Sequence, residues 1–280
     1  MTTLNFQIVN VFTRAGARLS GNPLCVFEDG SALDSQQMQA LALQFNLSET
    51  TFLFPSTRAN AAVRIFTPRY EMPFAGHPTL GTAQVCRALG LGGDSLTLEM
   101  EIGIIPVKAA GHSWTLEAVA RGWREVDESR ATLAEMLGVH ASDIGERPLW
   151  VNAGREQLVV PLTSEGAVRK VTVRADLLTK LRSADGFGMA YVFALAGEQA
   201  LARFFFPQGS TAIEDPATGS ATANLGGWFL AMDRALPARV DISQGEYTGR
   251  PSLLHVRVDE QRGIFVSGEV IEVGRGTIEL

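Results

Sequence analysis

The sequence is poor in cysteine and has no surplus of basic charge, and each shortage excludes a class of protein. Only two of its 280 residues are cysteine, Cys25 and Cys86, and both stand alone in apolar surroundings without C-x-x-C spacing. A small secreted scaffold needs paired cysteines, so we expect two buried, unreactive thiols. Lys and Arg number 24 against 30 Asp and Glu, for a formal charge of −6, and they are scattered singly. This balance argues against a nucleic-acid partner.

Long apolar runs and metal-ligand spacings are also missing. No window approaches the roughly 20 apolar residues of a membrane span, and the opening MTTLNFQIVNVF lacks the basic and apolar regions of a targeting segment. We therefore expect a cytoplasmic protein with no membrane partner. The four histidines lie far apart and none begins H-x-x-x-H or H-x-H, so no metal site is predicted.

Nucleotide and hydrolase motifs fail on inspection. The run Gly90-Leu91-Gly92-Gly93 lacks the third glycine spacing of a dinucleotide fingerprint and follows a predicted helix, and no G-x-x-x-x-G-K-[ST] occurs. Ser220 has no glycine at position 218, which a nucleophile elbow requires. The sequence thus gives no reason to expect a nucleotide cofactor or a serine hydrolase.

Hydrophobic residues make up 46% of the chain, which is enough for a substantial core, and the length favours two lobes. Alternating and helical periodicities mix along the chain. Helices are predicted at 35–46, from about 78 to 90, at 130–137, near 175–181 and after 219. Strands are predicted at 6–12, 24–27, 50–54, 61–67, 96–100, 104–109, 114–118, within 148–161, and at 189–194, 201–206, 252–258, 263–266 and 270–273.

The most informative feature is an internal repeat. The segment from Glu71 to His77 reads EMPFAGH, and the segment from Glu214 to Ser220 reads EDPATGS, so Glu, Pro and Gly coincide at a constant offset of 143 residues. In both places an aromatic strand, a proline and an acidic residue precede the glycine, and a predicted helix follows it. A repeat this long is typical of two duplicated lobes rather than of a solenoid.

Physical chemistry gives these two helix starts a function. The first N–H groups of a helix have no intrahelical partner and carry about half a positive charge, so they bind carboxylate or phosphate. Glycine immediately before the helix lets a ligand approach the backbone. We expect Gly76-His77 and Gly219-Ser220 to form one anion-binding site. The alternative is two ordinary capped helices, with Ser220 as an N-cap and Pro78 in the first turn.

At these residues the sequence resembles the phenazine biosynthesis PhzF-like isomerases of the diaminopimelate epimerase-like fold superfamily. The resemblance is spread in order over nearly the whole chain. It consists of Ser20-Gly21-Asn22-Pro23, Asn46-Leu47-Ser48-Glu49-Thr50-Thr51-Phe52, Phe66-Thr67-Pro68, Glu71-Met72-Pro73-Phe74-Ala75-Gly76-His77-Pro78, Glu214-Asp215-Pro216-Ala217-Thr218-Gly219-Ser220-Ala221, and Gln244-Gly245 with Gly249-Arg250-Pro251-Ser252.

The resemblance implies an α+β fold of two pseudo-symmetric lobes, each a curved mixed β-sheet or barrel around a central helix. It places residues 1–118 with 266–280 in the N-terminal lobe and 119–265 in the C-terminal lobe, and the active site in the cleft between the lobes. It also implies a homodimer. The resemblance brings no metal or organic cofactor. The partner that it implies is a small-molecule carboxylate substrate.

The resemblance also assigns roles to individual residues. Glu49 would move a proton between carbons of a small cyclic or unsaturated carboxylic acid, a role for which burial tunes the pKa of a glutamate. His77 and Asp215 join Glu49 as expected catalytic residues. The expected substrate-binding residues are Ser48, Gly76, Gly219 and Ser220.

Each catalytic residue has a structural alternative, and two further functions stay open. His77 could be a helix cap or a core histidine satisfied by a backbone carbonyl, and Asp215 a capping or turn residue. An epimerase or racemase of an amino or hydroxy acid is the second function, although its two-thiol form needs cysteine where His77 and Ser220 stand. A non-catalytic carboxylate-binding protein is the third.

Overall fold

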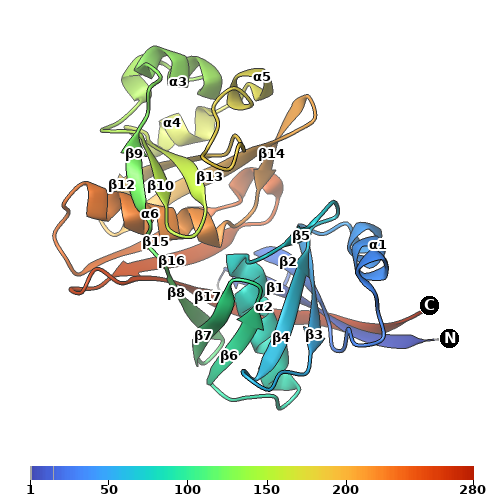
Figure 1. Ribbon diagram of the computed structural model, residues 1–280. Coiled ribbons are helices and arrows are strands. Elements are labelled where there is room, and N and C mark those ends of the chain that lie inside the picture. The colour runs from blue at the N-terminus through green and yellow to red at the C-terminus, as the bar shows by residue number, and fades with distance from the viewer. Residues whose placement is uncertain (1, 15) are drawn as a thin grey trace. The chain divides into compact units, whose positions relative to one another are not determined.

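The computed structural model describes residues 2–14 and 16–280, and the chain forms two compact units. Unit 1 lies within Met1–Glu117 and Ser267–Leu280, and unit 2 is Ala118–Val266. In each unit one long helix lies among strands, α2 in unit 1 and α6 in unit 2 (Figure 1). Each unit therefore has the α+β character that the sequence predicts.

The strands of unit 1 pair in a mixed pattern. β2 runs parallel to β3 and β4 parallel to β6, whereas β1–β2, β3–β4, β4–β5, β6–β7 and β7–β8 are antiparallel. The end of β17 pairs with β1, from Glu279 opposite Thr3 to Glu269 opposite Thr13. The bounds are β1 Thr3–Thr13, β2 Asn22–Phe27, β3 Glu49–Phe54, β4 Ala61–Phe66, β5 Glu71–Met72, β6 Ser95–Met100, β7 Gly103–Ala110, β8 Ser113–Ala118 and β17 Ile264–Glu279.

Helix α2 (Gly76–Ala88) is the core of unit 1 and packs against β1, β2, β3 and β6. Its small residues allow this close packing. A Cβ added to Gly81 would lie only 2.6 Å from Cδ2 of Leu24 on β2, so only glycine fits there without displacement. A second helix, α1 (Ser35–Phe45), begins with a capping box at Asp34 and packs Met38 and Leu41 into a separate apolar cluster.

Unit 2 has its own mixed sheet, in which β11 runs parallel to β12 and β13 parallel to β15. Helix α6 (Gly219–Ala231) packs against β9, β10, β11 and β16, while three short helices take part in a separate core cluster. The strands are β9 Gly122–Glu125, β10 Leu149–Asn152, β11 Glu156–Pro161, β12 Ala190–Ala196, β13 Gln199–Gln208, β14 Thr211–Asp215, β15 Ala238–Gln244 and β16 Ser252–Val258. The short helices are α3 Arg130–Leu137, α4 Glu165–Lys170 and α5 Ala175–Leu178, with single 3₁₀ turns at Ala141–Asp143 and Glu246–Thr248.

The two units repeat one order of elements. An antiparallel pair (β1–β2 or β10–β11) leads into a parallel partner (β3 or β12), then into antiparallel strands (β4–β5 or β13–β14). The central helix follows, and the next strand, β6 or β15, returns parallel to β4 or β13. The predicted fold class, two pseudo-symmetric lobes with a central helix in each, is therefore confirmed.

Several boundaries differ from the sequence-based expectation. Helix α2 begins at Gly76 rather than at Pro78, and α5 ends at Leu178 instead of 181. Residues 263–266 and 270–273 are not two strands, because β17 continues from Ile264 to Glu279. Antiparallel pairing with β1 runs from Glu269 to Glu279 with register shifts, so no break separates residues 270–273 from the rest of the strand. Helix α4, the short strands β5, β9 and β14, and the seven-residue strand β15 were not predicted.

The longest helices, α2 and α6, have 13 residues each. Within residues 2–14 and 16–280, no helix combines the length and the apolar character needed to cross a bilayer.

Candidate active site

Glu49 is the first residue of β3, directly after the turn that ends α1. Asn46 caps that helix in the left-handed conformation, with φ of 50°, and so directs the chain into the strand. β3 then runs parallel to β2 with Glu49 opposite Leu24. The side chain of Glu49 is 16% exposed, which places its carboxylate at a largely shielded position beside α2.

His77 lies in the first turn of α2 and faces Glu49. Nε2 of His77 is 3.4 Å from Oε2 of Glu49, and the imidazole is only 7% exposed. The backbone of Pro23 forms a hydrogen bond with the same ring. Proline has no N–H, so the partner must be its carbonyl and the imidazole must donate. β2 and β3 thus supply both polar neighbours of His77.

The contacts of His77 fix its tautomer. Among the described residues Nε2 has no hydrogen-bond partner, so the ring nitrogen that donates to Pro23 is Nδ1. Burial lowers the pKa of His77 to about 3, against the smaller opposing effect of the Pro23 hydrogen bond. The imidazole is therefore neutral at physiological pH, and Nε2 presents a lone pair to Glu49.

The other predicted residues of unit 1 lie next to this pair. Gly76 is the first residue of α2 and is preceded by Ala75 as N-cap, which makes no side-chain capping hydrogen bond. Ser48 is exposed and adjoins Glu49 in the chain. Neither His77 nor Pro78 is the N-cap, so the capping alternative for His77 is wrong, while its predicted contact with a backbone carbonyl is present.

In unit 2, Asp215 ends β14 and is held by two side chains. The Thr218 hydroxyl donates to Oδ2 of Asp215, and Nε2 of Gln244 donates to the Asp215 carbonyl at 2.9 Å and to Oγ1 of Thr218 at 3.0 Å. The Thr218 N–H contacts Oε1 of Gln244 at 3.4 Å, which is consistent with this orientation of the amide. The carboxylate of Asp215 is therefore an acceptor whose direction is set by Thr218.

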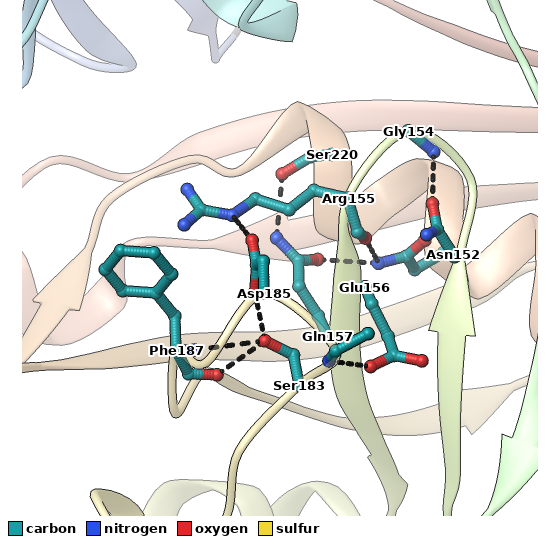
Figure 2. A network of polar contacts seen from close by, with 11 residues as sticks. Asn152, Gly154, Arg155, Glu156, Gln157, Ser183, Asp185, Phe187 and Ser220 are labelled. Carbon is teal, nitrogen blue, oxygen red and sulfur yellow. Dashed lines mark hydrogen bonds and ion pairs between the residues drawn. The ribbon is translucent and has the colours of Figure 1, made fainter. Parts of the chain in front are cut away.

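Gly219 and Ser220 open α6, as the repeat predicts. The N-cap is Thr218, not Ser220, and it makes no side-chain capping hydrogen bond. The Ser220 hydroxyl instead accepts a hydrogen bond of 2.9 Å from Nε2 of Gln157 on β11 (Figure 2). The expectation that Ser220 is an ordinary N-cap is thus wrong, because its side chain turns toward the neighbouring strand.

Metal ligands and reactive thiols do not gather at either helix start. Within the described residues, no three His, Cys, Asp or Glu side chains are grouped so as to hold a metal ion. Cys25 and Cys86 are free and fully buried. Burial raises the pKa of Cys86 to about 12 and that of Cys25 further above its ordinary value, so both thiols are protonated.

Comparison with known proteins identifies the family. The family described as phenazine biosynthesis-like protein matches residues 9–276. The chain belongs to this family. A relative in Pseudomonas chlororaphis, named trans-2,3-dihydro-3-hydroxyanthranilate isomerase, is 35% identical over 99% of both chains. An uncharacterized isomerase of Pasteurella multocida is 36% identical over 99% of this chain and 95% of the relative. The predicted enzyme class, an isomerase, is confirmed.

Solved structures agree with the phenazine biosynthesis-like assignment at the level of the fold. The crystal structure of a Bacillus anthracis PhzF-family protein matches with a TM-score of 0.87 and 23% identity over the whole of both chains. A hydroxyproline epimerase from Agrobacterium vitis matches with a TM-score of 0.63 and 13% identity over 99% of this chain and 93% of that one. Both share the predicted diaminopimelate epimerase-like architecture.

Sequence reasoning missed three residues that contact predicted site residues, and a fourth, Asn224, that contacts one of these three. Pro23 and Gln244 lie inside motifs that carried the family resemblance, but their contacts with His77 and Thr218 are long-range. Gln157 and Asn224 were not singled out at all. One signal was available: Asn224 is a polar residue within the apolar run ANLGGWFLAM, where a buried amide needs specific partners.

Proposed function

We propose that this protein is a cofactor-independent isomerase that moves a proton between two carbons of a small cyclic or unsaturated carboxylic acid. The observation that carries the proposal is the contact between the Glu49 carboxylate and the neutral Nε2 of His77. A carbon acid needs a base that is shielded from water and close to a group that stabilises its protonated form. Glu49 has both properties.

The proposed reaction uses Glu49 as both base and acid. Glu49 removes a proton from one carbon, and the electron pair of that C–H bond enters the unsaturated system of the substrate. The protonated Oε2 then donates a hydrogen bond to the lone pair on Nε2 of His77, which stabilises the intermediate state. The proton returns to a second carbon, so the sum of atoms and charge is unchanged and no oxidant or reductant is required.

The remaining predicted residues complete this proposal. Ser48, Gly76, Gly219 and Ser220 are assigned to substrate binding, because helix N-termini and hydroxyl groups donate to carboxylate oxygens. Asp215 is assigned to acid–base chemistry or to orientation of substrate. A cytoplasmic location is also proposed from the hydropathy of the sequence, and a homodimer from the resemblance. Light scattering of the purified protein tests the homodimer.

Two-thiol epimerisation is not proposed for this chain. It requires one cysteine as a thiolate base opposite a second as a thiol acid, and burial keeps both thiols protonated. A carboxylate-binding protein without turnover remains the competing function. The test must therefore separate binding from proton transfer.

The first probe is trans-2,3-dihydro-3-hydroxyanthranilate, the compound that names several relatives. The protein is incubated with it in D₂O, in parallel with other cyclic and unsaturated acids and with proline-type amino acids, and deuterium is located by NMR and mass spectrometry. We expect deuterium at one carbon together with net isomerisation of at least one unsaturated acid. Glu49→Gln should slow this reaction by roughly 10²- to 10⁴-fold.

The matched control is Glu101→Gln, which changes an exposed glutamate of the same unit and should leave turnover unchanged. Full turnover by Glu49→Gln would refute the role of Glu49. Bound acid with no deuterium incorporation anywhere in the set would favour the non-catalytic function. Deuterium incorporation with racemisation of a proline-type acid would favour an epimerase.

A further inference from the structure

A buried chain of polar side chains connects Ser220 to the hairpin between β10 and β11. Gln157 on β11 is 1% exposed and Asn224 on α6 is 0% exposed. Nε2 of Gln157 donates to Oγ of Ser220 at 2.9 Å, and Nδ2 of Asn224 donates to Oε1 of Gln157 at 2.8 Å. In Figure 2 the Gln157 side chain extends from its strand toward Ser220 at the start of the helix.

The backbone fixes the direction of every hydrogen bond in this chain. The Ala153 N–H donates to Oδ1 of Asn224 at 2.7 Å, and Nδ2 donates to the Arg155 carbonyl at 2.9 Å. If the Asn224 amide were flipped, its NH₂ group would face the Ala153 N–H and its oxygen would face the Arg155 carbonyl. The NH₂ group of Asn224 therefore also faces Oε1 of Gln157, and the NH₂ group of Gln157 faces Ser220.

This direction determines what Ser220 offers to a ligand. The NH₂ group of Gln157 has no lone pair to accept from a hydroxyl, so Oγ of Ser220 can only accept from it. The single hydroxyl hydrogen of Ser220 is consequently left for another acceptor. Ser220 is only partly buried, in contrast to Gln157 and Asn224 beneath it. The chain thus leaves the hydroxyl hydrogen of Ser220 available to an acceptor atom of a ligand.

Unit 1 carries a glycine at the helix position that Asn224 occupies in unit 2. Asn224 lies five residues after Gly219, and Gly81 lies five residues after Gly76 in the repeated segment. Gly81 packs directly against Leu24 on β2, which occupies the place in the strand order that β11 has in unit 2. Buried amides are costly unless paired. Unit 2 thus has a buried and paired amide, Asn224, at the helix position where unit 1 has a glycine.

We infer that Gln157 and Asn224 are positioning residues that hold the Ser220 hydroxyl as a donor to an oxygen acceptor of the substrate, namely a carboxylate or carbonyl oxygen. The inference rests on the proposed function, in which Ser220 binds substrate, and adds the polarity of that contact. A hydrogen bond to a charged acceptor contributes enough to change affinity about 10- to 100-fold.

The decisive variants are Gln157→Leu, Ser220→Ala and the two combined. Gln157→Leu removes the contact with Ser220, introduces the residue type found at Leu24, and keeps the bonds of Asn224 to Ala153 and Arg155. Binding is measured with anthranilate, a carboxylate related to the compound that names several relatives, and turnover with any acid that the wild type converts. The control is Gln36→Leu, the same substitution at an exposed position of α1.

Each single variant should weaken anthranilate binding about 10- to 100-fold and raise KM more than it lowers kcat, whereas the control should bind as the wild type does. The double variant should be no weaker than Ser220→Ala alone, because Gln157 acts through Ser220. Unchanged binding in Gln157→Leu, or a further loss in the double variant, overturns the inference. A wild type that binds no anthranilate overturns it together with the binding role of Ser220.

A measurement without ligand tests the hydrogen-bond chain itself. The side-chain amide signals of Gln157 and Asn224 are compared by ¹H–¹⁵N NMR in the wild type and in Ser220→Ala. Loss of the hydroxyl should shift the Gln157 signals most, and unchanged signals overturn the inference. Failure of the proposed function is a different result, since it appears as wild-type binding without deuterium incorporation.

Discussion

Nε2 of His77 lies 3.4 Å from Oε2 of Glu49, while the opposite side of the imidazole donates to the Pro23 carbonyl. The order of the strands explains this geometry. β2 and β3 run parallel with Leu24 opposite Glu49, so Pro23 and Glu49 come to the same end of the pair beside the first turn of α2. A carbonyl that fixes one nitrogen leaves the other as an acceptor for a protonated carboxyl.

The buried imidazole predicts a characteristic pH dependence of stability. The pKa of His77 is about 3 in the fold because of burial, against about 6.5 for an ordinary histidine. Between these values the unfolded chain binds a proton that the native state does not. The free energy of unfolding should therefore fall as pH decreases from 6.5 toward 3, by up to roughly 1.4 kcal/mol per pH unit from this group, and its contribution should be constant above pH 6.5.

Two measurements check the titration of His77. The imidazole NMR signals of His77 should not titrate between pH 5 and 8, because burial lowers the pKa of His77 to about 3. His77→Gln should flatten the pH dependence of urea unfolding between pH 6.5 and 3. A midpoint near 6.5 for His77 would show that its ring is not held neutral, and would remove the acceptor role proposed for Nε2.

The hydrogen bond from the Thr218 hydroxyl to Asp215 predicts graded losses of kcat/KM in variants of these two residues. Asp215→Asn removes the charge and should lower kcat/KM by about 100-fold or more if Asp215 acts in catalysis. Thr218→Val keeps the shape but removes the donor to Asp215, so it should lower kcat/KM by a smaller factor. Thr218→Ser keeps the hydroxyl and should remain near the wild type. Steady-state kinetics on the converted acid measures all three, and equal losses in Thr218→Ser and Thr218→Val would contradict the role of the hydroxyl.

The sequence allowed prediction of the parts of the site that depend on local pattern. The repeat of glycines placed both helix starts, because a glycine before an apolar helical run is a local signal, and the family resemblance supplied Glu49 and His77. The contacts that orient the side chains of Ser220 and His77 were not predictable from local pattern. Gln157 reaches Ser220 across 63 residues of chain, and the partner of His77 is a backbone carbonyl, which every residue possesses.

The same reasoning explains why secondary structure was predicted unevenly. Helix α3 matched its expected bounds because Ser129 and Gly138 cap it in recognisable ways. β5 has only two residues, and it forms because Met72 and Glu71 pair with Ile65 and Phe66 of β4. No local pattern of two residues carries such a signal. Tertiary pairing, rather than propensity, determines these short elements.

The two cysteines should be chemically inert in the folded protein. Both are fully buried, and burial raises the pKa of Cys86 to about 12, so neither supplies a thiolate near neutral pH. Iodoacetamide should not modify the native protein at pH 7.5, as mass spectrometry would show, and should modify both cysteines in urea. Replacing both by alanine should keep deuterium incorporation unchanged apart from losses in stability. Rapid native labelling coupled to loss of activity would restore a thiol mechanism.

The close packing around Gly81 predicts that a larger side chain at this position destabilises unit 1. A Cβ at this position would lie 2.6 Å from Cδ2 of Leu24, 3.0 Å from Cγ2 of Val11 and 3.1 Å from Cγ2 of Val9. Alanine normally favours a helix over glycine by about 1 kcal/mol, but overpacking a core costs about 1 to 3 kcal/mol. We expect Gly81→Ala to lower the free energy of unfolding by about 1 to 2 kcal/mol, measured by urea denaturation.

The control for this prediction is Gly93→Ala, because no atom lies within 4 Å of a Cβ added at Gly93. That variant should be neutral or slightly stabilising, since it only restricts the unfolded chain. Leu24→Val shortens the side chain that Gly81→Ala would meet, so the double variant should recover part of the loss. If Gly81→Ala were as stable as Gly93→Ala, the close approach of α2 to β2 would have to relax without cost. Leu24 would then not constrain the helix start that carries His77.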